Sequence, residues 1–318
     1  MLQLLLGGSG SGKTTLLYQR IRARAEKGEK SILLVPEQFT SSTEGRIYRE
    51  LGDALSGMVE SFSFTSLAEK ILSTEGGAAV QTLSDAGRAV LVRRALEELQ
   101  DNVHYYHRHR RSAAFCQMAA QTIDELKSAG LSGQQLAQLA GACGAESGKL
   151  SELALIFQGY ETLLARSGMD PSDRLELAGA RLEEALARHS LPEFLRDRAV
   201  FIDEFDTFNA PKKRLLGAML AALPSVTVAL CDDGAPLLPG DLSLFSGAKQ
   251  VAAQLRQLAR KNGAEVAVPQ LLRKDLRHRN APGLAAVAER MPRRARCGFL
   301  PRPAGRRRPV PLPVPSGG

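Results

Sequence analysis

The sequence predicts an α/β fold in which a large all-helical segment interrupts a parallel sheet. Five short apolar runs are typical of buried strands, and helical patterns follow most of them. Such alternation favours parallel strands joined by right-handed crossovers. Between residues 74 and 198 the strand pattern disappears and amphipathic helices replace it. We therefore expect one sheet domain from residues 1–73 and 199–285, a helical insertion at 74–198 and a separate tail at 286–318.

The strands and helices are predicted from the spacing of apolar residues and from the residues that end each apolar run. Each strand is an apolar run that ends at Gly, Pro or polar residues, and each helix repeats apolar residues at helical spacing. The predicted strands cover residues 1–6, 31–35, 58–62, 199–202 and 226–230. The predicted helices cover residues 14–26, 43–51, 63–70, 84–99, 113–129, 132–140, 151–167, 173–189 and 212–222.

The stretch GGSGSGKTT lies between the first predicted strand and the first predicted helix. Its spacing matches the phosphate-binding loop of P-loop nucleotide-binding proteins, in which glycines let backbone N–H groups converge on phosphate oxygens at a helix N-terminus. Lys13 would contact the terminal phosphates of ATP, and the Thr14 hydroxyl would bind Mg²⁺. The predicted nucleotide-binding residues are Gly7, Gly8, Ser9, Gly10, Ser11, Gly12, Lys13, Thr14 and Thr15.

An acidic pair follows the strand predicted at residues 199–202. Asp203 would bind Mg²⁺ through water, and Glu204 would act as the catalytic residue that polarises the attacking water. An Asp-Glu pair favours an ATPase over a small-molecule kinase. The alternative is a solvated acidic pair at a strand end.

Five segments together carry a family resemblance: GGSGSGKTT, ILLVPEQFTSSTE, VESFSFTSLAEKIL, the stretch around IDELKSAGLS, and FIDEFDTFNAPKKRLL. In order and spacing over about residues 1–285 they resemble the B subunit (AddB) of AddAB-type helicase-nucleases, whose first half is similar to superfamily 1 (UvrD-like) helicases. The resemblance implies a RecA-like fold, binding of ATP, Mg²⁺ and DNA, and a role in processing double-strand DNA ends for recombinational repair. It also implies an AddA-type partner subunit, with single-stranded and double-stranded DNA ends as substrates.

The resemblance implies that two segments, residues 35–39 and 61–66, lie where superfamily 1 proteins touch single-stranded DNA. They contain the predicted DNA-binding residues Gln38, Ser61, Phe62, Ser63 and Phe64. Phe62 and Phe64 could stack on bases, or they could be core aromatics beneath the edge of the sheet.

Several parts of the family pattern are missing from the sequence. We expect no adenine-reading glutamine before the first strand, and residues 229–240 contain no glutamine that would couple hydrolysis to DNA. We also expect no arginine fingers from a second helicase domain, no nuclease domain and no iron-sulfur cluster. The chain alone should therefore turn over ATP slowly or not at all, and its status as an enzyme is open. The alternative function is a self-contained P-loop kinase or ATPase with a helical lid, whose candidate lid arginines are Arg88, Arg93 and Arg94.

The charge is uneven along the chain. Residues 273–318 hold twelve basic and two acidic residues, so the remainder holds 30 basic and 32 acidic residues and favours no particular partner. The proline-rich, basic tail at 286–318 is expected to be disordered. It is either an arm that binds nucleic-acid phosphates or coding DNA read out of frame.

The remaining signals concern location and metal. No apolar run approaches the roughly 18 to 20 residues that cross a bilayer, so we expect a cytoplasmic protein without membrane contact. The four cysteines are far apart and are expected to be buried free thiols. The run HYYHRHRR at 104–111 could grip phosphates and stack on bases, could bind a metal through its histidines, or could be a solvated loop between helices.

Overall fold

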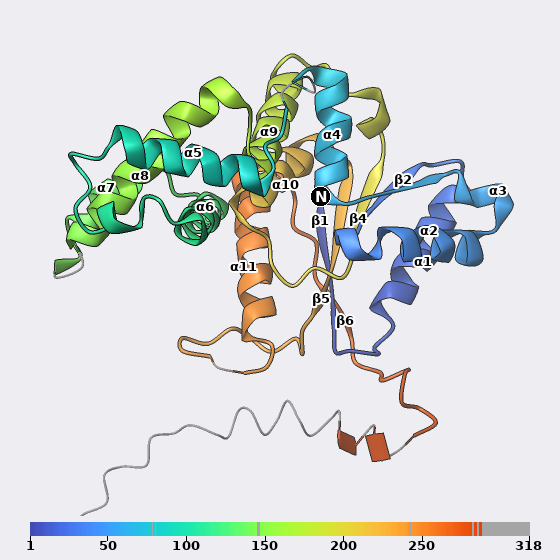
Figure 1. Cartoon of the computed structure of the whole chain (residues 1–318). Coiled ribbons are helices and arrows are strands. Elements are labelled where there is room, and N and C mark those ends of the chain that lie inside the picture. The colour runs from blue at the N-terminus through green and yellow to red at the C-terminus, as the bar shows by residue number, and fades with distance from the viewer. Residues whose placement is uncertain are drawn as a thin grey trace, which may run out of the picture.

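A six-stranded, all-parallel sheet forms the centre of the computed structural model (Figure 1). The structure describes residues 1–287 except 78, 80, 145, 146, 242, 282 and 285. The strand order is β3-β2-β4-β5-β1-β6, so β5 lies between β1 and β4. The strands are β1 (Leu2–Gly7), β2 (Ser31–Leu34), β3 (Val59–Phe62), β4 (Ala199–Ile202), β5 (Ser225–Cys231) and β6 (Gln270–Leu272).

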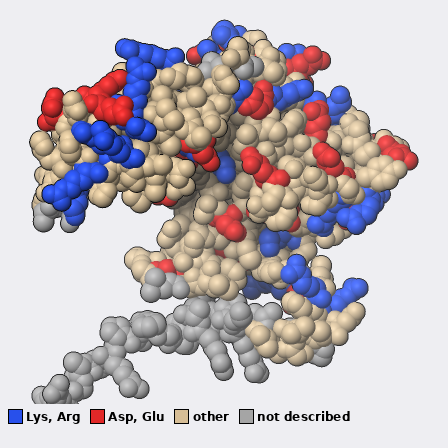
Figure 2. Space-filling model, viewed as in Figure 1, with Lys and Arg blue, Asp and Glu red and all other residues tan. Residues whose placement is uncertain are grey.

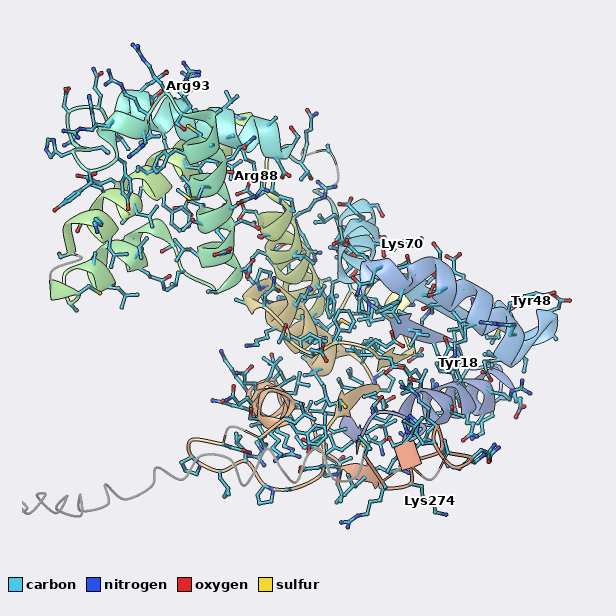
Figure 3. The ribbon with its side chains drawn as sticks, turned by 60° about the horizontal axis from the view of Figure 1, so that its bottom comes forward. Tyr18, Tyr48, Lys70, Arg88, Arg93 and Lys274 are labelled. Atoms are coloured by element: carbon cyan, nitrogen blue, oxygen red, sulfur yellow. The ribbon has the colours of Figure 1, made fainter. Side chains whose placement is uncertain are left out.

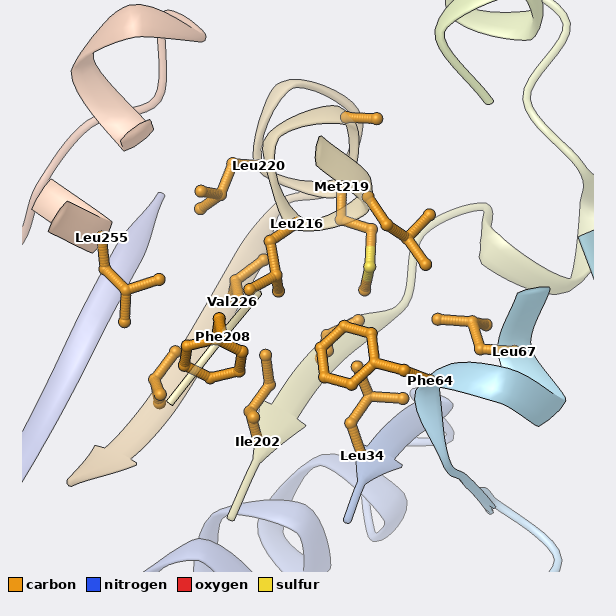
Figure 4. Close-up of a cluster of buried hydrophobic side chains, with 14 of the residues drawn as sticks. Leu34, Phe64, Leu67, Ile202, Phe208, Leu216, Met219, Leu220, Val226 and Leu255 are labelled. Carbon is orange, nitrogen blue, oxygen red and sulfur yellow. The ribbon is translucent and has the colours of Figure 1, made fainter. Parts of the chain in front are cut away.

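Side chains alternate along each strand, and the two faces of the sheet bury two separate cores. On one face, Leu34, Ile202 and Val226 pack against the four helices α4 (Phe64–Glu75), α9 (Pro171–Ala187), α10 (Ala210–Ala222) and α11 (Ser246–Lys261) (Figure 4). On the other face, Leu33 and Phe201 pack against α1 (Lys13–Ala25) and α2 (Thr40–Leu51), which the short α3 (Asp53–Ser56) follows. Because both faces are covered, the strands are largely apolar.

The helical subdomain stands beside the sheet and has its own core. It consists of α5 (Asp85–Glu98), α6 (Ala113–Ser128), α7 (Gly133–Ala140) and α8 (Ser147–Ser167). Phe157 and Tyr160 of α8 are its largest fully buried side chains. The last helix of the predicted insertion, α9, instead packs against α4 and α10 and shares the core of the sheet. Four amphipathic helices suffice to enclose the second core, and the apolar stripe of α9 is left to cover the sheet.

The predicted α/β class and parallel sheet are confirmed, with most element ends shifted by one to four residues. Helix α11 and strand β6 were not predicted. Cys116 is buried as expected, but Cys143 is exposed and Cys231 half-buried, so the expectation of buried thiols is wrong for these two. Within the described ranges, no helix is long and apolar enough to cross a membrane. The predictions for the tail lie outside the described residues, apart from 286 and 287.

Candidate nucleotide site

The glycine loop joins the end of β1 to the start of α1. Gly10 and Gly12 have φ angles of +79° and +88°, in the left-handed region that favours glycine. Both glycines are also crowded: a Cβ on Gly10 would lie 2.7 Å from Arg277 Cβ, and one on Gly12 would lie 2.9 Å from Leu276 Cδ1. Gly12 is the N-cap of α1 and offers no side chain to the first turn of that helix. The free N–H groups of this turn therefore face the loop and can bind an anion.

Lys13 and Ser11 provide polar groups inside the loop. The Lys13 ammonium donates hydrogen bonds to the carbonyl oxygens of Gly7 and Gly8, at 2.8 and 2.9 Å. The Ser11 hydroxyl is buried and has no partner among the described residues. A cation that donates its hydrogen bonds to neutral carbonyls can be transferred to a phosphate with a net gain in electrostatic energy.

Thr14 and Asp203 meet although they are far apart in the sequence. Asp203 follows β4 and is only 6% exposed, and its carboxylate accepts hydrogen bonds from the Thr14 hydroxyl and from the backbone N–H of Glu204. Burial raises the pKa of Asp203, and these two hydrogen bonds and the Lys13 charge offset only part of the shift. Parallel strands place their carboxyl ends at one edge, which brings these two segments together. The predicted magnesium ligands are thus neighbours in the fold.

Glu204 has a strained backbone, with a φ angle of +64° that residues other than glycine rarely adopt. Burial, and then the Asp203 charge, raise the pKa of its carboxyl group. Strain of this kind costs about 1 to 3 kcal/mol and is retained mostly where it serves a site.

A pocket of about 560 Å³ lies over these groups and opens at the carboxyl edge of the sheet. Ala229 and Cys231 of β5 line it between the two polar segments. Two arginines that the sequence analysis missed also line it. Arg46 comes from α2, with its guanidinium 4.9 Å from the centre of the Tyr18 ring, and Arg277 donates a hydrogen bond to the Ser9 hydroxyl at 3.1 Å.

Arg277 reaches the pocket because residues 273–278 cross over the glycine loop. The Leu276 N–H donates to the Gly10 carbonyl at 2.9 Å, and Asp275 pairs with His278 at 2.8 Å to hold the turn. The segment follows β6, so assigning a strand to QLL at 270–272 would have placed the basic run after it at this edge.

A second pocket of about 400 Å³ adjoins the first, and both are lined by Glu204, Phe205 and Asp206. Of the predicted DNA-binding residues, Gln38, Ser63 and Phe64 line it, whereas Ser61 and Phe62 do not.

Phe64 and Ser63 are both engaged in the fold. The Phe64 ring is only 2% exposed and makes edge contacts with Phe205 and Phe208, at centroid distances of 5.2 and 6.0 Å. Ser63 caps α4 through a reciprocal pair of hydrogen bonds with Ser66.

The neighbouring Phe62 packs against Phe194, with ring centroids 6.5 Å apart. The geometry therefore favours the core alternative for both Phe62 and Phe64. Gln38, Thr65, Thr207 and Lys212 are the uncharged and basic groups of the second pocket that a ligand could reach, and Glu37, Glu204 and Asp206 line it as well.

The candidate lid arginines do not line the nucleotide pocket. Arg88 pairs with Asp85 and Asp124. Arg93 and Arg94 each pair with a glutamate one turn along α5. Figure 3 places Arg88 and Arg93 in the helical subdomain. The kinase alternative therefore loses the residues that would face a phosphate.

Comparison with known proteins identifies the family. A family described as "ADDB, N-terminal" matches residues 4–288, nearly the whole described chain. The chain belongs to the AddB N-terminal family. Its relatives include the B subunits of the ATP-dependent helicase/deoxyribonuclease from Desulforudis audaxviator, 34% identical over 305 residues, and from Moorella thermoacetica, 33% identical over 279 residues. The corresponding subunit of Anoxybacillus flavithermus is 31% identical over 293 residues.

The chain spans about a quarter of the length of these AddB relatives. The alignments cover 92%, 83% and 87% of this chain but only 25%, 24% and 24% of the three relatives. The sheet domain and the helical subdomain therefore correspond to one part of a longer subunit, and the similarity extends over both.

Proposed function

We propose that this chain binds Mg²⁺ and ATP at the glycine loop and contacts single-stranded DNA beside it, as part of a helicase-nuclease that processes DNA ends. The hydrogen bond between Thr14 and Asp203 is the observation that carries the nucleotide site. It joins a hydroxyl and a carboxylate, hard oxygen ligands that suit Mg²⁺, next to a loop that can cradle phosphate.

Six residues of the first pocket have a task in this proposal. Lys13 moves from the loop carbonyls to the terminal phosphates, and Thr14 and Asp203 hold the metal, which when bound would neutralise phosphate charge. Arg46 and Arg277 add positive charge at the open side. Glu204 orients a water molecule, and its raised pKa makes it a stronger base than an ordinary glutamate.

The segment from Glu204 to Asp206 links nucleotide to DNA in this proposal, because it forms a wall of both pockets. The second pocket offers the Gln38 amide, the exposed Thr65 hydroxyl and the Lys212 ammonium for the backbone and base edges of a strand. Lys212 lies 5.6 Å from the ring centres of both Phe64 and Phe205, so those rings position the cation.

The biological role proposed for the chain follows from its relatives, which are named as B subunits of an ATP-dependent helicase/deoxyribonuclease. An AddA-type subunit would be its partner, and single-stranded and double-stranded DNA ends would be its substrates. Turnover by this chain alone should be weak, since residues 229–240 contain no glutamine to couple hydrolysis to DNA.

Binding of a fluorescent ATP analogue, with and without Mg²⁺, tests the nucleotide site. Thr14→Val removes the metal-binding hydroxyl and should abolish the Mg²⁺-dependent part of the affinity, whereas the matched Thr162→Val, on an exposed face of α8, should leave it unchanged. Equal Mg²⁺ dependence in both variants would refute the site. DNA-independent phosphate transfer to a small acceptor would instead support the kinase alternative.

A further inference from the structure

The loop between α5 and α6 carries an aromatic surface that the proposed function does not use. Residues 103–112 (the aromatic loop) contain the short helix η2 (His107–His109) and lie at the end of the helical subdomain away from the sheet (Figure 1). A pocket of about 420 Å³ (the aromatic pocket) opens there. Its lining residues are Tyr105, Tyr106, His109, Ala114, Phe115, Met118 and Lys149.

A buried carboxylate fixes the backbone of the aromatic loop. Glu152 of α8 is only 7% exposed and accepts hydrogen bonds from the N–H groups of His104, Tyr105 and Tyr106, at 2.7 to 3.2 Å. Hydrogen bonds to a charged acceptor are about twice as strong as those between neutral groups. The loop is therefore held in one conformation, although most of its side chains are exposed between the two helices, as the alternative of a solvated loop expects.

The rings of the pocket are held in place while part of the surface faces solvent. Tyr106 stacks on Phe115 with centroids 5.3 Å apart, and His109 lies 5.5 Å from the same ring. Tyr105 is 57% exposed, and its ring lies over Gly148, where an added Cβ would come within 2.9 Å of Tyr105 Cε2. Because residue 148 is glycine, the Tyr105 ring can pack directly against the backbone at this position.

Positive charge surrounds these rings. Arg108 and Arg111 are exposed and form no ion pair with any described residue, and Lys149 lines the pocket itself. By contrast, Arg93 and Arg94 on the neighbouring helix α5 are both paired with glutamates. Figure 2 shows basic side chains on this end of the molecule, with acidic side chains among them.

We infer that the aromatic pocket and the two arginines form a second binding surface for single-stranded DNA. Exposed, preorganised rings provide stacking platforms for bases, and unpaired arginines beside them attract the phosphates between those bases. A peptide ligand would need carboxylates to match this charge, whereas a DNA strand provides an anion for every base. The metal alternative for the histidines has no support, because no group of three metal-ligating side chains occurs in the part of the chain that the structure describes.

This inference rests on the proposed function in one respect, the choice of DNA over RNA as the ligand. Its rings and charges belong to the helical subdomain, and none of its residues lines either pocket at the edge of the sheet. A strand that reaches both surfaces would bind more tightly than either surface alone allows.

Fluorescence anisotropy of a labelled oligothymidine with the full chain tests the inference. Tyr105→Ala should weaken binding about 5- to 150-fold, the range expected for losing one stacked base. Tyr48→Ala is the matched control, because Tyr48 is 54% exposed and lies on α2 at the other side of the molecule (Figure 3), and it should have no effect. An abasic oligomer should lose little affinity with Tyr105→Ala but much with Arg108→Gln combined with Arg111→Gln.

The same titrations in a Thr65→Glu background separate the two surfaces, since this change places a carboxylate at the second pocket of the sheet domain. Weaker binding from Tyr105→Ala in that background supports the aromatic surface whatever happens at the second pocket. If Tyr105→Ala matches Tyr48→Ala in both backgrounds while Thr65→Glu weakens binding, the inference fails and the proposed function stands. If Thr65→Glu has no effect and Tyr105→Ala does, the DNA part of the proposed function fails instead. Tighter binding of an oligouridine than of oligothymidine would overturn the choice of DNA.

Discussion

The helical subdomain and the sheet domain both bury carboxylates, but they surround them differently. Asp170, at the junction of the two parts, accepts hydrogen bonds from the Lys127 ammonium at 2.9 Å and the Tyr160 hydroxyl at 2.6 Å, and Lys127 also pairs with Asp173 at 2.7 Å. Asp203, at the edge of the sheet, is also buried, but its partners among the described residues are an uncharged hydroxyl and an N–H group, from which it accepts hydrogen bonds. The first carboxylate is neutralised within the fold, and the second faces a pocket.

The pKa shifts follow this difference. Burial lowers the pKa of Lys127, but Asp173 and Asp170 outweigh it and raise the net value, so the lysine stays charged. Burial of Asp203 is not outweighed, and its pKa rises. A buried charge that the fold compensates only in part indicates a site that a cation completes, whereas a fully compensated charge indicates a structural role.

Lys127→Met should have the largest effect on stability. It leaves the buried Asp170 and the half-buried Asp173 carboxylates without their cation, which should reduce the free energy of unfolding by about 3 to 5 kcal/mol. Urea denaturation measures this change, with Arg93→Met as the control, since an exposed pair contributes about 1 kcal/mol or less. An equal loss from both variants would contradict the comparison.

Asp203→Asn should separate stability from binding. The amide keeps the size of the side chain and removes a buried charge, so the free protein should gain thermal stability, about 2 to 4 °C for each kcal/mol. Mg²⁺-dependent nucleotide affinity should fall about 10- to 150-fold with the loss of a charged ligand. Thermal unfolding and nucleotide titration measure the two effects, and a variant that loses both stability and binding would show that Asp203 is structural.

The pH dependence of nucleotide binding follows from Asp203. Because its folded pKa is raised above the unfolded value, the free protein loses stability as the pH rises through these two values. Mg²⁺ binding requires the charged carboxylate, so affinity should fall on acidification at a higher pH than the ordinary aspartate value of 3.8 implies. Titrations with the fluorescent nucleotide at a series of pH values measure the pH at which half of the Mg²⁺-dependent affinity is lost. This pH-dependent loss should be absent in Asp203→Asn.

Arg277→Gln should have the smallest effect. Its guanidinium is exposed and screened by solvent, so nucleotide affinity should fall only about two- to fivefold. Arg279→Gln, two residues further along the same segment, is the control. A loss as large as that of Asp203→Asn would mean that residues 273–278 close over the nucleotide and exclude water.

Features that depend on local chemistry could be predicted from the sequence alone. The glycine loop is recognisable because its backbone needs residues that tolerate positive φ, and both Gly10 and Gly12 adopt such angles. The strand at 199–202 was predicted with its bounds because AVFI is apolar throughout and ends at Asp203. Parallel strands then require Asp203 to lie at the same edge as the loop.

The tertiary structure was needed to show which groups share that edge of the sheet and which segments cover them. The order of strands placed β5 between the two halves of the site, and the segment after β6 brought Arg277 onto Ser9 from 268 residues away. Phe64 is buried because Phe205 and Phe208 enclose its ring.

The same holds for the aromatic loop, where Tyr105 is exposed because Glu152 fixes its backbone and Gly148 leaves room for its ring. These contacts join residues distant in sequence. Their free energy comes from close packing in three dimensions, which no local pattern encodes.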